Sequence, residues 1–380
     1  MQELFFVGGF FLLMFFAVSL VFQRLRLPPL LAYIFLGLAL APFLMELWVS
    51  IIENIAHVGI VLLFLLLGLQ FPLNRLLSIS RRIWPVGLLD IVLNFGISLI
   101  IAYLLGLSLM SALIISGVAY ATSSSITIKM SEETKRSTTP EAEFSLALLI
   151  FEDLASPILV SLLAGLIIQD TITITLLLFI LLKAIFISVI AILIAIHGFK
   201  RFEIFLQHYI STELMPLFAI SLALICSGFA VYLGLSELLG AFLAGVMLSE
   251  AGTSKELEKI IIPLKDVTLP FFFFWFGTSI SFGQGEVPVF TLIVLILWGI
   301  VGKVIVGYYG GKTYGLSSKG AIRASFSLIP RGEFSVVIAT LASYALRISA
   351  GIYIVVTSII GVFLFRGAPK IADYLFNRNK

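Results

Sequence analysis

The chain has 380 residues, of which 60% are hydrophobic and 12% charged, and its mean hydropathy is +1.15. Soluble domains are about half apolar and a quarter charged, so this composition excludes an ordinary water-soluble protein. The net charge of +3 decides nothing about partners, and the single Cys226 excludes a disulfide framework within the chain. The sequence has no Cys or His spacing typical of a metal site, so we expect no metal, no cofactor and no nucleic-acid partner.

Apolar stretches long enough to cross a bilayer recur along the whole chain. A span takes roughly 20 apolar residues. The first stretch lacks the basic front and small-residue cleavage site of a signal peptide, so we expect it to be retained as a span. The sequence therefore predicts an all-α polytopic membrane protein whose surroundings are the lipid bilayer. The thirteen predicted spans are 3–23, 29–46, 51–69, 84–105, 110–129, 142–168, 173–197, 212–233, 236–250, 266–282, 288–311, 319–344 and 350–367.

Basic residues alternate between the segments that connect these spans. Segments after odd-numbered spans carry Lys and Arg, among them Arg24, Arg82, Lys135 and Lys255, whereas segments after even-numbered spans carry only Arg347. Cytoplasmic loops are enriched in Lys and Arg. We therefore expect a multi-pass protein of the cell membrane with its N-terminus outside and its C-terminus in the cytoplasm.

The chain resembles itself at a shift of 208 or 209 residues. Residues 25–41 align with 233–249 with six of seventeen positions identical, and Gly68 aligns with Gly277. An odd number of spans separates the two copies, so they run in opposite directions, as in many secondary transporters. The predicted organisation is a first inverted six-helix repeat at 1–168, a linker helix at 169–211, and a second repeat with a short cytoplasmic tail at 212–380.

Two predicted spans are interrupted at corresponding positions. Residues 121–125 have the sequence ATSSS, residues 330–333 have the sequence PRGE, and Ser123 plus 209 is Gly332. Such interruptions free backbone groups that lipid cannot satisfy, so they occur where the chain faces protein or a water-filled cavity. Matched interruptions in two repeats point to crossed broken helices around a transport site. Close packing of small residues is the alternative for ATSSS.

Three ionisable residues are predicted to lie deep in the bilayer. Glu152 and Asp153 interrupt span 142–168, with Asp153 roughly 16 Å from its cytoplasmic end, and Lys303 lies roughly 12 Å deep in span 288–311. A charge at this depth is costly and is a functional candidate by default. A structural buried ion pair is the alternative for all three residues.

The predicted chemistry is exchange of a small monovalent cation for protons. A carboxylate in a partly dry cavity can bind either a proton or a hard cation, so one site exchanges the two when it faces each side in turn. Asp90 and Asn94 are weaker candidates, because a satisfied hydrogen bond between helices explains them equally well. The predicted ion ligands are Asp153, Glu152, Thr122, Ser123 and Ser124, with Lys303 as the ion-pair partner and Arg331 and Glu333 as supports or gates of the broken helix.

At these residues the chain resembles the cation:proton antiporter-2 family, which includes bacterial Na⁺/H⁺ antiporters and glutathione-gated K⁺ efflux systems. The resemblance covers nearly the whole chain. It implies an NhaA-like fold of thirteen helices, a homodimer, and elevator-like movement of a core domain against a dimerisation domain. The motifs that carry it are LPPLLAYIFLGLALAP (27–42), VGIVLLFLLLGLQ (58–70), ATSSS (121–125), FEDLASP (151–157), GLSELLGAFLAGVMLSE (234–250), LPFFFFWFGTSI (269–280), GK (302–303) and PRGEFS (330–335).

The resemblance also implies individual roles. Asp153 matches the essential ion-binding aspartate of the family, and Lys303 matches the lysine that pairs with the neighbouring acid in electrogenic members. Glu152 departs from the family, since relatives have Asp, Gln or Asn there, and this leaves the stoichiometry open. No nucleotide-binding motif follows the last span, so we expect no nucleotide-binding regulatory domain in this chain.

The favoured function is Na⁺/H⁺ antiport, with K⁺ or Li⁺ as other possible cations. A K⁺/H⁺ antiporter or a K⁺ efflux pathway of the same family is the first alternative. An organic-anion symporter of related fold would need less buried negative charge. An intramembrane enzyme would need a nucleophile–base pair, which no spacing in the sequence supports, so we expect no enzymatic activity.

Overall fold

The computed structural model describes residues 2–70, 82–169, 173–199, 214–250, 254–280 and 287–377. Within these residues every regular element is a helix, and the chain forms two compact units. Unit 1 contains Met1–Ser78 and Pro157–Ser279, and unit 2 contains Ile79–Ser156 and Ile280–Lys380. Each unit thus combines two stretches that are far apart in the sequence.

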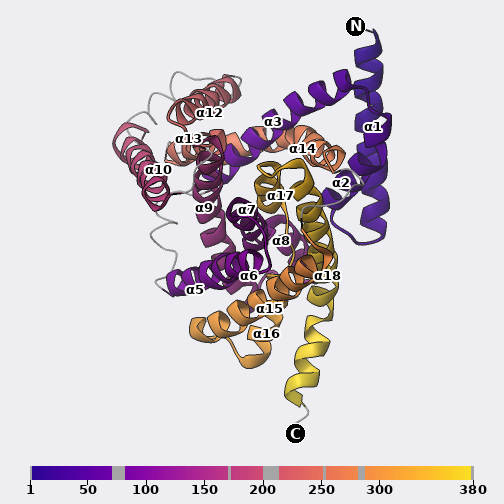
Figure 1. The fold of residues 1–380 in the computed structure, drawn as a ribbon, viewed down its shortest axis with the longest axis vertical. Coiled ribbons are helices and arrows are strands. Elements are labelled where there is room, and N and C mark those ends of the chain that lie inside the picture. The colour runs from indigo at the N-terminus through magenta and orange to yellow at the C-terminus, as the bar shows by residue number, and fades with distance from the viewer. Residues whose placement is uncertain are drawn as a thin grey trace. The chain divides into compact units, whose positions relative to one another are not determined.

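Unit 1 is built mainly from long apolar helices (Figure 1). The π-helix η3 continues α10 directly, and the 3-10 helix η1 ends α2. Its elements are α1 (Gln2–Arg24), α2 (Pro29–Leu40), η1 (Ala41–Phe43), α3 (Glu46–Leu69), α10 (Ile174–Ile194), η3 (Ala195–Phe199), α12 (Met215–Tyr232), α13 (Glu237–Ser249) and α14 (Ser254–Thr278).

Unit 2 contains the interrupted helices. The helix α9 (Pro140–Gln169) begins in unit 2 and ends in unit 1, with Pro157 at the boundary. The other elements of unit 2 are α5 (Ile83–Asp90), the π-helix η2 (Ile91–Ile97), α6 (Ser98–Leu104), α7 (Leu109–Tyr120), α8 (Ser124–Glu133), α15 (Val289–Tyr314), α16 (Ser318–Ser327), α17 (Glu333–Thr340) and α18 (Tyr344–Asn377).

The helices confirm an all-α polytopic membrane protein. Ten helical segments of the described chain are long and apolar enough to cross a membrane. Of the other predicted spans, 29–46 and 236–250 correspond to shorter apolar helices at Pro29–Phe43 and Glu237–Ser249, and 319–344 contains the two short helices α16 and α17. The count of thirteen spans stays a prediction.

Two helices extend beyond their predicted spans. The predicted span 266–282 is part of α14, which already begins at Ser254, and 350–367 lies inside α18, which continues to Asn377. Lys255, predicted to lie in a connecting segment, is on the first turn of α14. Hydropathy underestimates the length of such helices, because an amphipathic helix can continue past the edge of the apolar layer.

Glycines bring two helix pairs of unit 1 into close contact. A Cβ atom on Gly37 of α2 would lie 3.0 Å from the Cα of Gly277 on α14. A Cβ on Gly245 of α13 would lie 2.8 Å from the Cα of Gly68 on α3. Such small residues let helix backbones approach closely in a membrane, where dispersion rather than the hydrophobic effect drives association.

We expect Gly245→Ala to lower the thermal stability of the purified protein. The added methyl group would meet the backbone of α3 at Gly68, and overpacking of this kind costs about 1–3 kcal/mol. The matched control is Gly228→Ala in α12, where the added Cβ meets no atom within 4 Å. The control should melt at the wild-type temperature or slightly above it. Equal melting temperatures for the two variants would contradict the close packing of α3 on α13.

Candidate ion-binding site

The two interrupted helices of unit 2 meet at their interruptions. The α7–α8 pair is broken at 121–123 and the α16–α17 pair at 328–332. The backbone N–H of Ser123 donates to the carbonyl of Pro330 at 2.8 Å, and the Ser123 hydroxyl caps α8 by accepting from the N–H of Ile126 at 3.2 Å. A Cβ on Gly332 would collide with the side chain of Ser123, so a glycine is needed for this approach.

Hydroxyl groups from each broken helix satisfy carbonyls of the other. Ser335 on α17 donates to the carbonyls of Val118 and Ala121 at 2.8 and 3.0 Å. Thr127 on α8 donates to the carbonyl of Ser327 at 2.8 Å. A carbonyl without a partner costs several kcal/mol in hydrocarbon, so these hydroxyls are what makes the interruptions tolerable.

Arg331 and Glu333 lie at opposite ends of the second interruption. The fully buried guanidinium of Arg331 donates to the carbonyls of Leu328 and Ile329 at 3.2 and 2.9 Å, beside the C-terminus of α16. Glu333 starts α17 and accepts from the hydroxyls of Ser123 (3.1 Å) and Ser125. A cation at a helix C-terminus and an anion at a helix N-terminus both complement the helix dipole. The positions of Arg331 and Glu333 therefore suit the predicted role of supporting the broken helix.

Lys303 lies in a buried cluster of charges. Its ammonium nitrogen on α15 is 2.9 and 3.0 Å from the two carboxylate oxygens of Asp90, and 3.0 Å from Oε1 of Glu152. All three side chains are fully buried. The ring of Tyr120 lies 5.4 Å from the same nitrogen, and Asn94 donates to Asp90 at 2.7 Å. The cluster ties α5, η2, α9 and α15 together.

Both carboxylate oxygens of Glu152 are occupied. The backbone N–H of Thr122 donates to Oε2 at 2.6 Å, and the Thr122 hydroxyl donates to Oε1 at 3.1 Å. Oε1 also accepts from Lys303. The structure thus places two predicted ion ligands, Glu152 and Thr122, in contact with each other, and Glu152 also contacts Lys303.

Asp153 is the available carboxylate at the interruptions. It is 7% exposed, and its Oδ1 atom has no hydrogen-bond partner among the described residues. The hydroxyl of Ser124, at the start of α8, hydrogen-bonds the Asp153 side chain. Consecutive helical residues point about 100° apart, so Asp153 and Glu152 point in different directions. Of the predicted ligands, Ser124 is therefore the one beside Asp153.

Asp90 is the residue that sequence reasoning undervalued. It ends α5, directly before the π-helix Ile91–Ile97 that contains Asn94. π-Helical segments are rare and often lie at functional sites, but they leave no mark in a hydropathy pattern. The available signal was a carboxylate in the interior of an apolar span, the same signal that singled out Asp153.

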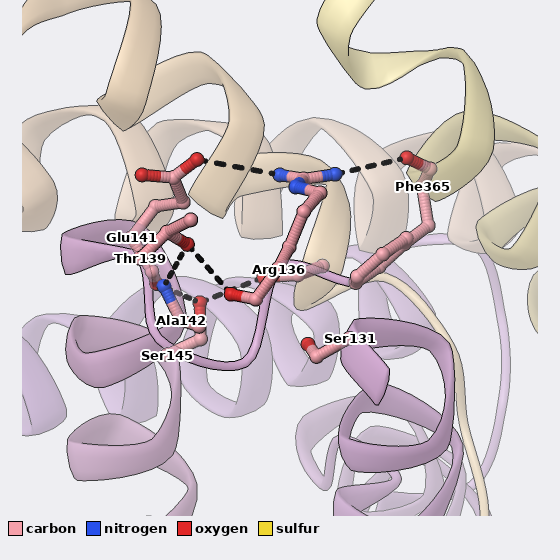
Figure 2. A pocket seen from close by; sticks show the side chains of 8 residues that line it. Ser131, Arg136, Thr139, Glu141, Ala142, Ser145 and Phe365 are labelled. Atoms are coloured by element: carbon pink, nitrogen blue, oxygen red, sulfur yellow. Dashed lines mark hydrogen bonds and ion pairs between the residues drawn. The ribbon is translucent and has the colours of Figure 1, made fainter. Parts of the chain in front are cut away.

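A separate polar pocket lies where α8 and α9 are joined (Figure 2). It is a small cavity of about 10 Å³ and reaches Ser327, whose hydroxyl is 2.7 Å from that of Ser145. Arg136 lines it and lies 3.7 Å from Glu141, which also pairs with Arg323 at 2.9 Å. Burial lowers the pKa of Arg136, against the opposing effect of Glu141. Because its carboxylate already pairs with two guanidinium groups, the pocket offers no free acid for a cation.

The fold and the buried acid define a class of protein. A polytopic helical chain whose interrupted helices meet beside a buried carboxylate with one unsatisfied oxygen has the features of a secondary transporter of small ions. Within the described residues, no group of three or more His, Cys, Asp or Glu could hold a metal ion.

Comparisons with known proteins identify the family. A family model described as sodium/hydrogen exchanger, transmembrane, matches residues 11–368. The ammonium/H⁺ antiporter subunit AmhT of Alkalihalophilus pseudofirmus is 42% identical over 374 residues, which cover 98% of this chain and 95% of AmhT. The K⁺/H⁺ antiporter subunit KhtU of Bacillus subtilis is 30% identical over 328 residues, which cover 85% of this chain and 80% of KhtU.

A solved structure has the same fold. The sodium proton antiporter MjNhaP1 from Methanocaldococcus jannaschii matches with a TM-score of 0.76 over 98% of each chain, at 16% identity. The chain belongs to the sodium/hydrogen exchanger family and is a monovalent cation:proton antiporter, not an enzyme. The resemblance to a cation:proton antiporter family is confirmed, although the NhaA-like details of the fold stay a prediction.

We expect Ser335→Ala to lower the thermal stability of the purified antiporter. The change leaves the buried carbonyls of Val118 and Ala121 without their hydroxyl donor, and an unsatisfied buried acceptor costs about 1–3 kcal/mol. The control is Ser188→Ala, whose hydroxyl bonds the Ala184 carbonyl of its own helix. A melting temperature as high as that of the control would show that the interruption does not need this hydroxyl.

Proposed function

We propose that Asp153 is the carrier of the exchanged ion. One observation supports this assignment above all: its Oδ1 atom is buried without a hydrogen-bond partner in the described part of the chain, whereas Glu152 and Asp90 are held by Lys303. Buried polar atoms are almost always satisfied, and an exception is expected where a ligand binds. A proton or a cation on Asp153 would fill this place.

The proposed cycle is alternating access at this one carboxylate. Asp153 binds either a proton or a small cation, and the hydroxyl of Ser124 and freed backbone groups at the interruption complete the cation's shell. Each species competes with the other for the same oxygens. Exchange then follows when the loaded site opens to each side of the membrane in turn.

We further propose that two inverted repeats form the transporter. The contacts repeat at the offset found in the sequence. The Val118 carbonyl accepts from Ser335, and the Ser327 carbonyl accepts from Thr127; these acceptors are 209 residues apart and these donors 208. Gly37 lies against Gly277, and Gly68 lies against Gly245 in the same way. This reciprocity supports an inverted repeat, with six spans on each side of a linker helix.

The proposed cation is Na⁺, with NH₄⁺ and K⁺ as second candidates. MjNhaP1 is named a sodium proton antiporter, which supports sodium, but its similarity to this chain is a similarity of fold. AmhT is named an ammonium/H⁺ antiporter subunit and KhtU a K⁺/H⁺ antiporter subunit, and these names favour NH₄⁺ and K⁺. Both proteins are more similar to this chain in sequence than MjNhaP1 is.

The names of AmhT and KhtU also contain the word subunit. This supports an assembly with further chains, in addition to the homodimer that the family resemblance implies.

We expect Asp153→Asn to abolish cation-driven proton flux, because an amide takes up no proton near neutral pH and has no negative charge to offset that of the cation. The measurement is collapse of a pH gradient in proteoliposomes by Na⁺, K⁺, Li⁺ and NH₄⁺, with protein-free vesicles to correct for leakage of ammonia. The control is Asp373→Asn, which removes an exposed carboxylate paired with Lys319. Normal flux in folded Asp153→Asn protein would exclude Asp153 as the carrier.

The proposed orientation is tested separately. With the N-terminus outside, the turn at Lys135 between α8 and α9 faces the cytoplasm. In a Cys226→Ala background, an impermeant thiol reagent applied to intact cells should not label Lys135→Cys, and it should label the residue once the membrane is permeabilised. Labelling in intact cells would overturn both the orientation and the odd number of spans between the repeats.

A further inference from the structure

We propose that Asp90 is a positioning residue of the exchange. Together with Glu152, it holds Lys303 as a fixed cation apart from Asp153, so that one cation is exchanged for one proton without net movement of charge. This inference rests on the proposed role of Asp153 and adds the stoichiometry of the exchange. Neither the family nor the names of its members fix that number.

The first argument is the number of donors and acceptors. A lysine ammonium has three N–H donors. Lys303 has three carboxylate oxygens around its nitrogen at 2.9, 3.0 and 3.0 Å, two from Asp90 and one from Glu152. All donors are thereby used within one fully buried cluster. No N–H of Lys303 is left for Asp153.

The second argument is the charge of the cluster. Asp90 and Glu152 contribute two negative charges and Lys303 one positive charge, so the sum is −1. The other donors to these carboxylates are neutral, namely the amide of Asn94 and the N–H and hydroxyl of Thr122. If Lys303 lost its proton, two buried carboxylates would face one neutral amine. That loss is opposed by the cost of buried charge without a counter-ion.

The third argument is the separation of Asp153 from this cluster. In the described part of the chain, the ion pairs of Lys303 are those with Asp90 and Glu152, and Oδ1 of Asp153 has no partner. Arg331, a second buried cation among the described residues, donates through its Nη1 atom to the backbone carbonyls of Leu328 and Ile329 and forms no ion pair there with Asp153. Glu333 accepts from serine hydroxyls. Loading of Asp153 therefore breaks no contact of Lys303, and one carboxylate alternates between one proton and one cation.

The stoichiometry is measured as a null point in proteoliposomes that hold the purified protein. At a fixed cation gradient, the pH gradient that stops net flux is determined with and without an imposed membrane potential. For one-to-one exchange, the null point should not move with potential. Exchange of two protons per cation would move it by about 0.8 pH unit per 100 mV, and that shift would overturn the inference.

The role of Asp90 is tested by rescue. Asp90→Asn removes one carboxylate from Lys303, so the freed ammonium competes with the cation for Asp153. We expect the apparent KM for the cation to rise roughly 10–100-fold, the range for loss of a group that orients an ion ligand. In the double variant Asp90→Asn/Lys303→Met, the competing cation is gone and the cluster again sums to −1. Its KM should return toward the wild-type value, even if its maximal rate is lower.

The outcomes separate the two proposals. A KM that stays raised in the double variant, or that does not rise in Asp90→Asn, would overturn the positioning role of Asp90. If either variant does not fold, the wild-type null point decides. Wild-type vesicles without any cation-driven proton flux would instead contradict the antiport on which both proposals rest. Asp373→Asn, which breaks an exposed pair with Lys319, should behave as wild type in every assay.

Discussion

The ammonium of Lys303 is the charge on which the arrangement of unit 2 depends. It lies away from water, and a charge in such a place is tolerated only when counter-charges and hydrogen bonds surround it. Asp90 and Glu152 supply both, from α5 and α9. Removing one partner of a buried pair costs roughly 3–5 kcal/mol. The ion pairs therefore hold α5, α9 and α15 in a fixed rotation and depth relative to one another. Because Glu152 is engaged in this way, Asp153 is the neighbouring acid that stays available.

The second constraint is the backbone of the two interruptions. Helix ends inside a bilayer expose carbonyls that lipid cannot satisfy. Here Thr127 and Ser335 reach across to the partner helix, and Arg331 closes the end of α16. ATSSS and PRGEFS look unlike membrane spans because they contain polar residues. These polar residues are nevertheless the groups that allow the two segments to lie within a membrane span. The same residues bring α8 to Asp153.

Much of this could be predicted from the sequence, because apolar stretches, buried acids and helix-breaking residues are local signals. The interruptions lie at Ser123 and Gly332, as their sequences indicate, and Asp153 lies beside Ser124. The partner of Lys303 could not be predicted. Which of several buried acids a lysine meets depends on the rotation and depth of whole helices, and the π-helix after Asp90 changes that rotation. The start of α14 could not be predicted from hydropathy either, because this helix begins in charged sequence at Ser254.

The difference between Glu152 and Asp153 explains why such a site would exchange ions rather than leak them. An empty Asp153 is a carboxylate without a counter-ion in a site of low dielectric constant, which is costly to move across a membrane. Binding of either a proton or a monovalent cation removes that charge. In the proposed cycle, movement between the two sides is therefore less costly for both loaded states than for the empty one. In the proposed cycle the charges of Asp90, Glu152 and Lys303 stay fixed, so the change in charge on loading falls on Asp153 alone, and this would couple the outward passage of one ion to the inward passage of the other.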